Sequence, residues 1–206
     1  MLVKVCGLTQ KQDVLAIDSL GVDMLGFIFY PKSPRYVKDR NLLQVKTRAK
    51  KVGVVVDYKV SDLEQLMQEY NLDLIQLHGE YEPTVCKSLG KEKVIKVFWP
   101  ARYEKASLLA KELEEFLPYV SYFLFDAGLK LGGHGKRIEP GEWKALVKDF
   151  PIILAGGIAP DNVKLFVSLN PLGLDVNSGV EVAPGLKDLA KVEQLLKIAK
   201  NYNEVE

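Results

Sequence analysis

Residues 152–179 read IILAGGIAPDNVKLFVSLNPLGLDVNSG and show the pattern that decides the fold: two short apolar runs, each followed by glycine or small polar residues. Similar runs, typical of buried strands, recur at intervals of 20 to 30 residues along the chain. They cover residues 2–6, 24–29, 52–56, 74–77, 94–98, 122–125, 152–155 and 173–176. Because these runs lack polar alternation, we predict the strands of a parallel sheet that is covered on both faces.

Most intervals between the runs carry apolar residues at helical spacing. Examples are Leu63, Leu66 and Met67, then Leu108, Leu109, Leu113 and Phe116, and finally Leu189, Val192, Leu195, Leu196 and Ile198. Strands that alternate with helices imply right-handed crossovers, and eight such units in 206 residues fit a (β/α)8 barrel. We therefore predict an α/β fold, a TIM barrel forming a single domain over residues 1–206. An open doubly wound sheet is the alternative.

The composition is that of an ordinary globular protein, with 48% hydrophobic and 27% charged residues. Lys and Arg number 28 against 27 Asp and Glu, so no basic excess points to a nucleic-acid partner. No apolar run reaches the roughly 18 residues of a membrane helix. The two cysteines make a poor disulfide framework, and a strand that begins at Leu2 leaves no room for a signal peptide. We expect a cytoplasmic protein that binds neither membranes nor nucleic acid.

In a TIM barrel, the active site lies at the carboxyl ends of the strands. Side chains alternate along the first predicted strand, so Lys4 and Cys6 share one face and Val3 and Val5 share the other. The valines suit the helix-covered exterior, which places Lys4 and Cys6 inside the barrel. The alternative role for Cys6 is that of a small buried hydrophobe. Because the first and last strands are neighbours in a closed barrel, we predict an interior ion pair, structural in role, between Lys4 and Asp175.

Polar residues also end the fourth and sixth predicted strands. Gln76 and His78 point the same way, with Leu77 opposed, and both are possible substrate contacts. A hydrogen-bonded structural role is the alternative for His78. Asp126 closes an apolar strand, and burial would raise its pKa and make it a proton donor near neutral pH. The alternative for Asp126 is a structural ion pair.

Glycines follow the last three predicted strands, at residues 132, 133 and 135, at residues 156–157 and at residue 179. Glycine lets backbone N–H groups approach an anion closely, and many TIM barrels bind phosphate at the loops after their seventh and eighth strands. A single pair of glycines would indicate only a tight turn, but three glycine clusters at one end of the barrel predict a phosphorylated ligand. Arg35 lies in a proline-stiffened loop, where it could contact a carboxylate or remain a solvated surface residue.

In order along the chain, these segments resemble the phosphoribosylanthranilate isomerase family of tryptophan biosynthesis. The motifs that carry the resemblance are KVCGLT at 4–9, GFIFYPKSPRY at 26–36, QLHG at 76–79, FD at 125–126, GGHGK at 132–136, LAGGI at 154–158 and DVNSGVE at 175–181. They occur in the family's order and span residues 4–181, nearly the whole chain.

The resemblance implies a barrel of the ribulose-phosphate-binding type and an Amadori rearrangement. The aminoaldose N-(5-phosphoribosyl)anthranilate would become 1-(2-carboxyphenylamino)-1-deoxyribulose 5-phosphate, with no metal and no organic cofactor. The family's general base matches Cys6, its general acid matches Asp126, and its carboxylate-binding arginine matches Arg35. Its phosphate-binding positions match Gly133, Gly135, Gly156, Gly157, Ser178 and Gly179. We expect a small phosphorylated substrate as the partner, and a monomer or homodimer.

Three positions depart from the family pattern. His134 stands where relatives usually have a small hydroxyl residue, Ala127 follows the acid where Thr or Ser is common, and Asn177 replaces a frequent Ser. They bear on how the loop after the sixth strand closes over the substrate. We expect His134 to lie in solvent, which an unchanged KM for His134→Ser would support. The sequence also does not show which group would lower the pKa of Cys6 from its usual value near 8.5.

Other phosphate-binding barrels are the nearest alternatives among enzymes. The histidine-pathway aminoaldose isomerase has an aspartate where this chain has Cys6. Indole-glycerol-phosphate synthase would need a catalytic lysine within residues 52–56, which have none. The tryptophan synthase α subunit lacks this pairing of a cysteine with an aspartate. A barrel that binds a sugar phosphate without catalysis is the alternative from another functional class.

Overall fold

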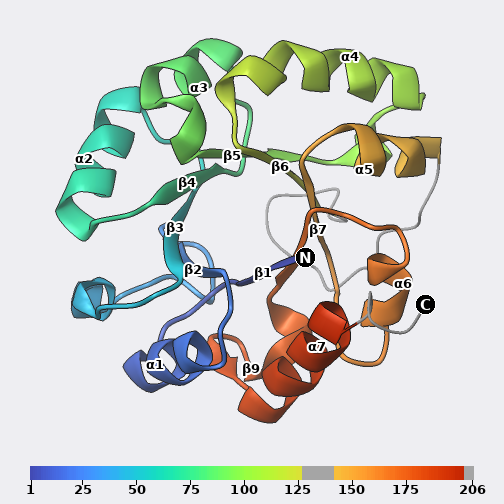
Figure 1. Ribbon diagram of the computed structural model, residues 1–206. Coiled ribbons are helices and arrows are strands. Elements are labelled where there is room, and N and C mark those ends of the chain that lie inside the picture. Colours follow the sequence, from blue (N-terminus) through green and yellow to red (C-terminus); the bar gives the residue numbers. More distant parts are fainter. Residues whose placement is uncertain (127–141, 202–206) are drawn as a thin grey trace.

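The computed structural model describes residues 1–126 and 142–201. Its eight parallel strands close into a barrel in the order β1 to β8, and the helices surround this barrel in Figure 1. The strands are β1 (Leu2–Val5), β2 (Met24–Ile28), β3 (Lys50–Val55), β4 (Leu74–Leu77), β5 (Val94–Phe98), β6 (Tyr122–Phe125), β7 (Ile152–Ala155) and β8 (Gly173–Val176). The predicted (β/α)8 barrel is confirmed, and the open sheet is wrong.

Seven α-helices and six short 3₁₀ turns are present in the described residues. The helices are α1 (Lys11–Ser19), α2 (Val60–Tyr70), α3 (Pro83–Leu89), α4 (Ala106–Phe116), α5 (Leu146–Asp149), α6 (Val163–Val167) and α7 (Leu189–Asn201). The turns are η1 (Arg40–Gln44), η2 (Lys91–Lys93), η3 (Pro100–Arg102), η4 (Leu117–Tyr119), η5 (Glu142–Ala145) and η6 (Ser178–Val180). None of the helices in this part of the chain is long and apolar enough to cross a membrane.

Two residues that the sequence placed on apolar helix faces are exposed instead. Leu108 is 53% exposed and Leu189 is 41% exposed. The buried face of α4 runs through Leu109, Leu113 and Phe116 at helical spacing. Leu108 lies one residue, and so about 100° around the axis, from Leu109 and projects away from the barrel.

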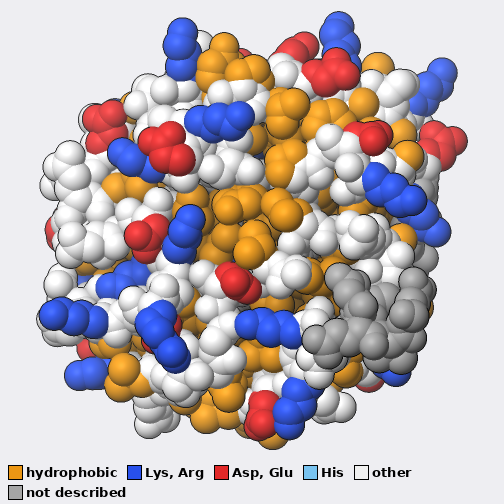
Figure 2. Space-filling view, in the orientation of Figure 1, with side chains coloured by type: hydrophobic (Ala, Val, Ile, Leu, Met, Phe, Trp, Pro, Cys, Tyr) orange, Lys and Arg blue, Asp and Glu red, His pale blue; other side chains and the backbone are white. Residues whose placement is uncertain are grey.

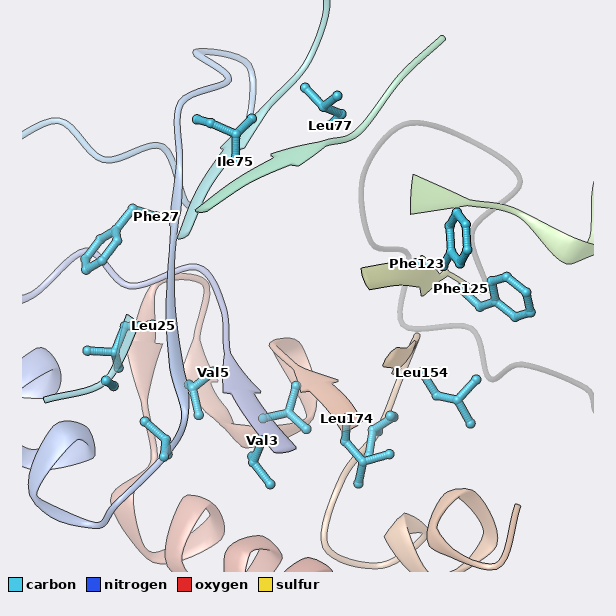
Figure 3. Close-up of a cluster of buried hydrophobic side chains, with 14 of the residues drawn as sticks. Val3, Val5, Leu25, Phe27, Ile75, Leu77, Phe123, Phe125, Leu154 and Leu174 are labelled. Atoms are coloured by element: carbon cyan, nitrogen blue, oxygen red, sulfur yellow. The ribbon is translucent and has the colours of Figure 1, made fainter. Parts of the chain in front are cut away.

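Alternation along the strands divides the core into two layers. Outward side chains pack between strands and helices, as Figure 3 shows for Val3, Val5, Leu25 and others. Inward side chains form a second cluster inside the barrel: Met24, Val52, Leu74, Ile95, Val97, Trp99, Leu124, Ile153 and Ala155. The apolar layers on both sides of each strand explain why the strands read as continuous apolar runs.

The strand register determines which side chains meet inside the barrel. Lys4 pairs with Asp175 across β1 and β8. Phe98 pairs with Phe125 across β5 and β6, and the Asp126 N–H donates to the Phe98 carbonyl at 3.0 Å. Trp99 and Asp126 are therefore neighbours at the carboxyl ends of β5 and β6.

Charged side chains of both signs are interspersed on the surface in Figure 2, around a central area of apolar side chains. This mixture agrees with a net charge of only +1. A molecule of this charge has little long-range attraction for an anion. An anionic ligand must therefore be held by particular residues.

Candidate active site

Lys4 and Asp175 form an ion pair inside the barrel. The Lys4 Nζ lies 2.9 Å from Asp175 Oδ1, and the two residues are 1% and 8% exposed. Burial alone would lower the pKa of Lys4, but the Asp175 carboxylate raises it above its ordinary value. Burial raises the pKa of Asp175, and the Lys4 ammonium opposes this shift. The predicted contact is present, while its structural role stays a prediction.

Cys6 lies just beyond the end of β1, close to this pair. Its Sγ would be 2.8 Å from a Cβ on Gly26, and the Lys4 Nζ would be 3.0 Å from the same atom, so only glycine fits at this position of β2. Burial raises the pKa of the Cys6 thiol, while Lys4 and Lys187 oppose the rise. The structure thus supplies the cations that the sequence did not show, but burial outweighs them.

Arg35 is not the solvated surface residue of the alternative prediction. Its side chain is 13% exposed, and it binds Glu181 through two nitrogens. The Arg35 Nε is 3.0 Å from both carboxylate oxygens, and Nη2 is 2.7 Å from Oε2. A guanidinium has five N–H donors, and these bonds occupy its Nε side, so the Nη1 edge faces away from Glu181.

Glu181 also binds Lys187, which completes a buried network beside β1 and β8. The hairpin of β9 (Glu181–Ala183) and β10 (Leu186–Lys187) places the Lys187 Nζ 2.8 Å from Glu181 and 3.0 Å from Asn177 Oδ1. Burial alone would raise the pKa of Glu181, but Arg35 and Lys187 lower it. Glu181 and Lys187 were not predicted as site residues. Glu181 ends a recognisable motif, but no sequence signal links it to Arg35, 146 residues away.

Three polar atoms inside the barrel have no hydrogen-bond partner within the described residues: Gln76 Oε1, His78 Nε2 and Trp99 Nε1. All three side chains are at least nine-tenths buried. The rings of His78 and Trp99 meet edge to face, with centroids 5.2 Å apart. The Nε2 of His78 therefore lacks the hydrogen bond of a structural histidine. Trp99 was not predicted as a site residue, because an aromatic residue at a strand end is typical of core.

We expect His78 to stay uncharged over the physiological pH range. Burial, helped by Lys96, lowers the pKa of His78 to about 4. The chain has two histidines, so a His134→Ser variant leaves His78 as the one imidazole signal in a proton NMR spectrum. That signal should not shift between pH 5.5 and pH 8. A titration midpoint near 6.5 would contradict the buried, neutral state.

Asp126 is 9% exposed, at the carboxyl end of β6. It lies near enough to Asp175 to raise the pKa of that carboxyl group. Asp126 and Cys6 thus both lie near the Lys4–Asp175 pair, inside one barrel. Ala127, Gly133, His134 and Gly135 lie outside the described residues, so their expected contributions stay predictions.

The glycine turns after β7 and β8 touch each other. Gly156 and Gly157 have φ angles of 106° and 65°, which favour glycine. Asn162 fixes the first turn, because its Nδ2 donates to the Gly157 carbonyl at 2.9 Å. A Cβ on Gly179, next to Ser178, would lie 2.0 Å from the Ile158 carbonyl oxygen, so the second turn needs glycine to pack on the first. Phosphate binding at these turns stays a prediction.

Comparison with known proteins gives a consistent family. The family model described as N-(5'phosphoribosyl)anthranilate (PRA) isomerase matches residues 3–198. The N-(5'-phosphoribosyl)anthranilate isomerase of Maridesulfovibrio salexigens is 43% identical over 194 residues, which cover 93% of this chain and 95% of the relative.

Solved structures agree with this result. The phosphoribosyl anthranilate isomerase of Thermus thermophilus superposes with a TM-score of 0.82 at 33% identity, covering 98% of this chain and all of that one. Another isomerase structure, in complex with reduced 1-(o-carboxyphenylamino)-1-deoxyribulose 5-phosphate, has a TM-score of 0.78 at 27% identity, with 98% and 100% covered. The chain belongs to the N-(5'-phosphoribosyl)anthranilate isomerase family, whose enzymes act in tryptophan biosynthesis.

Proposed function

We propose that this chain rearranges N-(5-phosphoribosyl)anthranilate to 1-(2-carboxyphenylamino)-1-deoxyribulose 5-phosphate, with Cys6 as the general base and Asp126 as the general acid. The observation that carries the assignment of roles is their placement. Both groups are buried at the carboxyl ends of their strands, around the same interior ion pair. An acid and a base that are held near each other in one small site can act on the same substrate.

The reaction needs one proton given and one proton taken. Asp126 protonates the furanose ring oxygen, and the ring opens to a Schiff base. The Cys6 thiolate then removes the proton from C2 of the ribose, which gives an enolamine, and this tautomerises to the ketone. The sum is an isomerisation in which no atom is gained or lost.

The two charged ends of the substrate have separate places in this proposal. The phosphate binds at the glycine turns after β7 and β8, which touch each other. The anthranilate carboxylate binds the Nη1 edge of Arg35, whose other edge Glu181 holds. The relative solved with a reduced product analogue supports a ligand of this class.

Arg35→Lys tests the carboxylate contact. An ammonium cannot bind Glu181 and a substrate carboxylate through two parallel pairs of bonds, so we expect KM to rise about tenfold with a change in kcat below about threefold. Steady-state kinetics measure both constants. Arg48→Lys is the matched control, since Arg48 lies on the surface beside Asp18 and should leave KM unchanged. A KM for Arg35→Lys equal to that of the wild type would contradict the contact.

The pH dependence of the reaction tests the thiolate. Burial raises the pKa of Cys6, so the thiolate is the minor form at neutral pH and its fraction grows about tenfold per pH unit below that pKa. In Asp126→Asn, where no acid loses its proton as the thiolate forms, we expect the residual kcat/KM to rise steadily from pH 6 to pH 8. Stopped-flow traces at each pH, within the stable range of the protein, provide the values. A flat profile over this range would contradict a buried thiol that must first lose its proton.

Turnover of freshly generated phosphoribosylanthranilate, followed by its anthranilate fluorescence, tests the activity itself. Rapid loss of signal is the expected result. An inactive protein that still binds the product would instead be a ligand-binding barrel or an enzyme for another sugar phosphate. We also propose that the chain works in the cytoplasm, as a monomer or homodimer. Light scattering measures the oligomeric state.

A further inference from the structure

The indole of Trp99 is held in one orientation at the carboxyl end of β5. The edge of the His78 ring packs against it at a centroid distance of 5.2 Å and an interplanar angle of 81°. The guanidinium of Arg102 lies 4.1 Å from the indole centroid and is itself bound to Glu80 at 2.9 Å. Because two neighbours fix the ring, the direction of its N–H is fixed as well.

This N–H is a donor that the described residues leave without an acceptor. Trp99 is 4% exposed, and its Nε1 is fully buried with no hydrogen-bond partner among them. An unpaired buried donor costs about 1–3 kcal/mol, so such atoms are rare unless another molecule completes the bond. The neighbouring His78 Nε2 is in the same state.

The position of Trp99 indicates which chemical group of that molecule accepts the hydrogen bond. Trp99 follows Phe98, as Asp126 follows Phe125, and these two phenylalanines are paired in register. A molecule bound at Asp126 therefore lies beside Trp99. In the closed barrel, β5 lies across from β1, beside which the Arg35–Glu181 network lies, and β6 separates β5 from β7 and its glycine turn. Arg102, the nearest cation, is already paired with Glu80, and an indole N–H carries no charge.

We propose that the indole N–H of Trp99 donates a hydrogen bond to a hydroxyl group of the substrate's pentose, next to the ring oxygen that Asp126 protonates. This inference rests on the proposed function and adds a residue that contacts the sugar. The neutral imidazole of His78 lines the same side and favours an uncharged part of the substrate. Trp99 thereby helps to distinguish a pentose from other compounds that carry a phosphate.

The fluorescence of Trp99 can report this contact directly. The chain has two tryptophans, and Trp143 lies in the outer layer, edge to face with Phe125. A Trp143→Phe variant therefore has Trp99 as its one indole. We expect ribulose 5-phosphate, which has no aromatic ring, to change the emission of this variant in a saturable way. Inorganic phosphate should bind without changing it.

Three outcomes would overturn the proposal. In the first, calorimetry shows that ribulose 5-phosphate binds, but the emission does not change. In the second, ribulose 5-phosphate fails to bind. In the third, inorganic phosphate changes the emission as much as ribulose 5-phosphate does. These results do not depend on turnover, so they are separate from a failure of the isomerase assignment.

Kinetics provide the second test, with matched variants. Trp99→Phe keeps an aromatic ring and removes the N–H, so kcat/KM should fall about three- to tenfold, as for the loss of one uncharged hydrogen bond. The same substitution at Trp143 should change kcat/KM less than about twofold. An active Trp99→Phe enzyme with wild-type kcat, KM and melting temperature would exclude the bond. Loss of stability without a change in either constant would assign Trp99 a packing role instead.

Discussion

Asp126→Asn should lower kcat for phosphoribosylanthranilate by about 10³-fold, while KM changes less than about threefold. The amide has nearly the shape of the carboxyl group but cannot give a proton to the ring oxygen, and general acid catalysis contributes roughly 10²–10⁴-fold. Cys6→Ser should have an effect of the same size, because an alcohol is a far weaker base than a thiolate at neutral pH. Steady-state and single-turnover fluorescence separate the chemical step from binding.

The second cysteine supplies the control for Cys6→Ser. Cys86 is buried in α3, outside the barrel, so Cys86→Ser removes a thiol of similar burial that has no proposed role. We expect it to lower the melting temperature and to leave kcat within about twofold. A Cys6→Ser enzyme with more than a tenth of the wild-type kcat would contradict the assigned base. An Asp126→Asn enzyme with more than a tenth of the wild-type kcat would contradict Asp126 as the general acid.

The strands could be predicted closely because each is largely apolar and is covered on both faces. Five of them begin and end at the predicted residues, for example β5 and β8. The start of β3 was placed two residues late, because Lys50 and Lys51 read as polar. Lys51 belongs to the strand nonetheless: its Nζ reaches the Leu43 carbonyl at 2.7 Å, and the residue is only 9% exposed. A long side chain can thus satisfy its charge without leaving an apolar layer.

The site could be predicted only where strand alternation and barrel closure decide the outcome. Alternation along β1 placed Lys4 and Cys6 inside the barrel, and barrel closure brought Asp175 beside them. Arg35 was expected to bind a substrate carboxylate or to remain in solvent, and a hairpin far along the chain brings Glu181 to one edge of its guanidinium. Contacts of this kind depend on loop conformations that no periodicity encodes.

Lys4→Met should destabilise the protein by about 3–5 kcal/mol, since it leaves the Asp175 carboxylate buried without its counterion. Urea unfolding monitored by circular dichroism measures this loss. An unchanged or increased stability would contradict a structural role for the pair. Activity should fall as well, because Lys4 opposes the rise in the pKa of Cys6 that burial causes.

The double variant Lys4→Met/Asp175→Leu separates loss of the pair from loss of packing. With both charges replaced by apolar groups, we expect most of the stability to return, because the cost of the single variant lies in the unpaired carboxylate. A double variant no more stable than Lys4→Met would show that packing around the lysine, and not its charge, is what the single variant lost.

The folding stability of the Lys4→Met variant should depend on pH, because Asp175 loses its counterion. Without the ammonium, burial raises the folded-state pKa of Asp175 further above its ordinary value near 3.9. The folded variant then holds a proton that the unfolded chain has released. Its stability is therefore greatest below about pH 4 and falls as the pH rises through the raised pKa. The deficit against wild type should be larger at pH 8 than at pH 5, and a deficit independent of pH would mean that Asp175 finds another cation when Lys4 is removed.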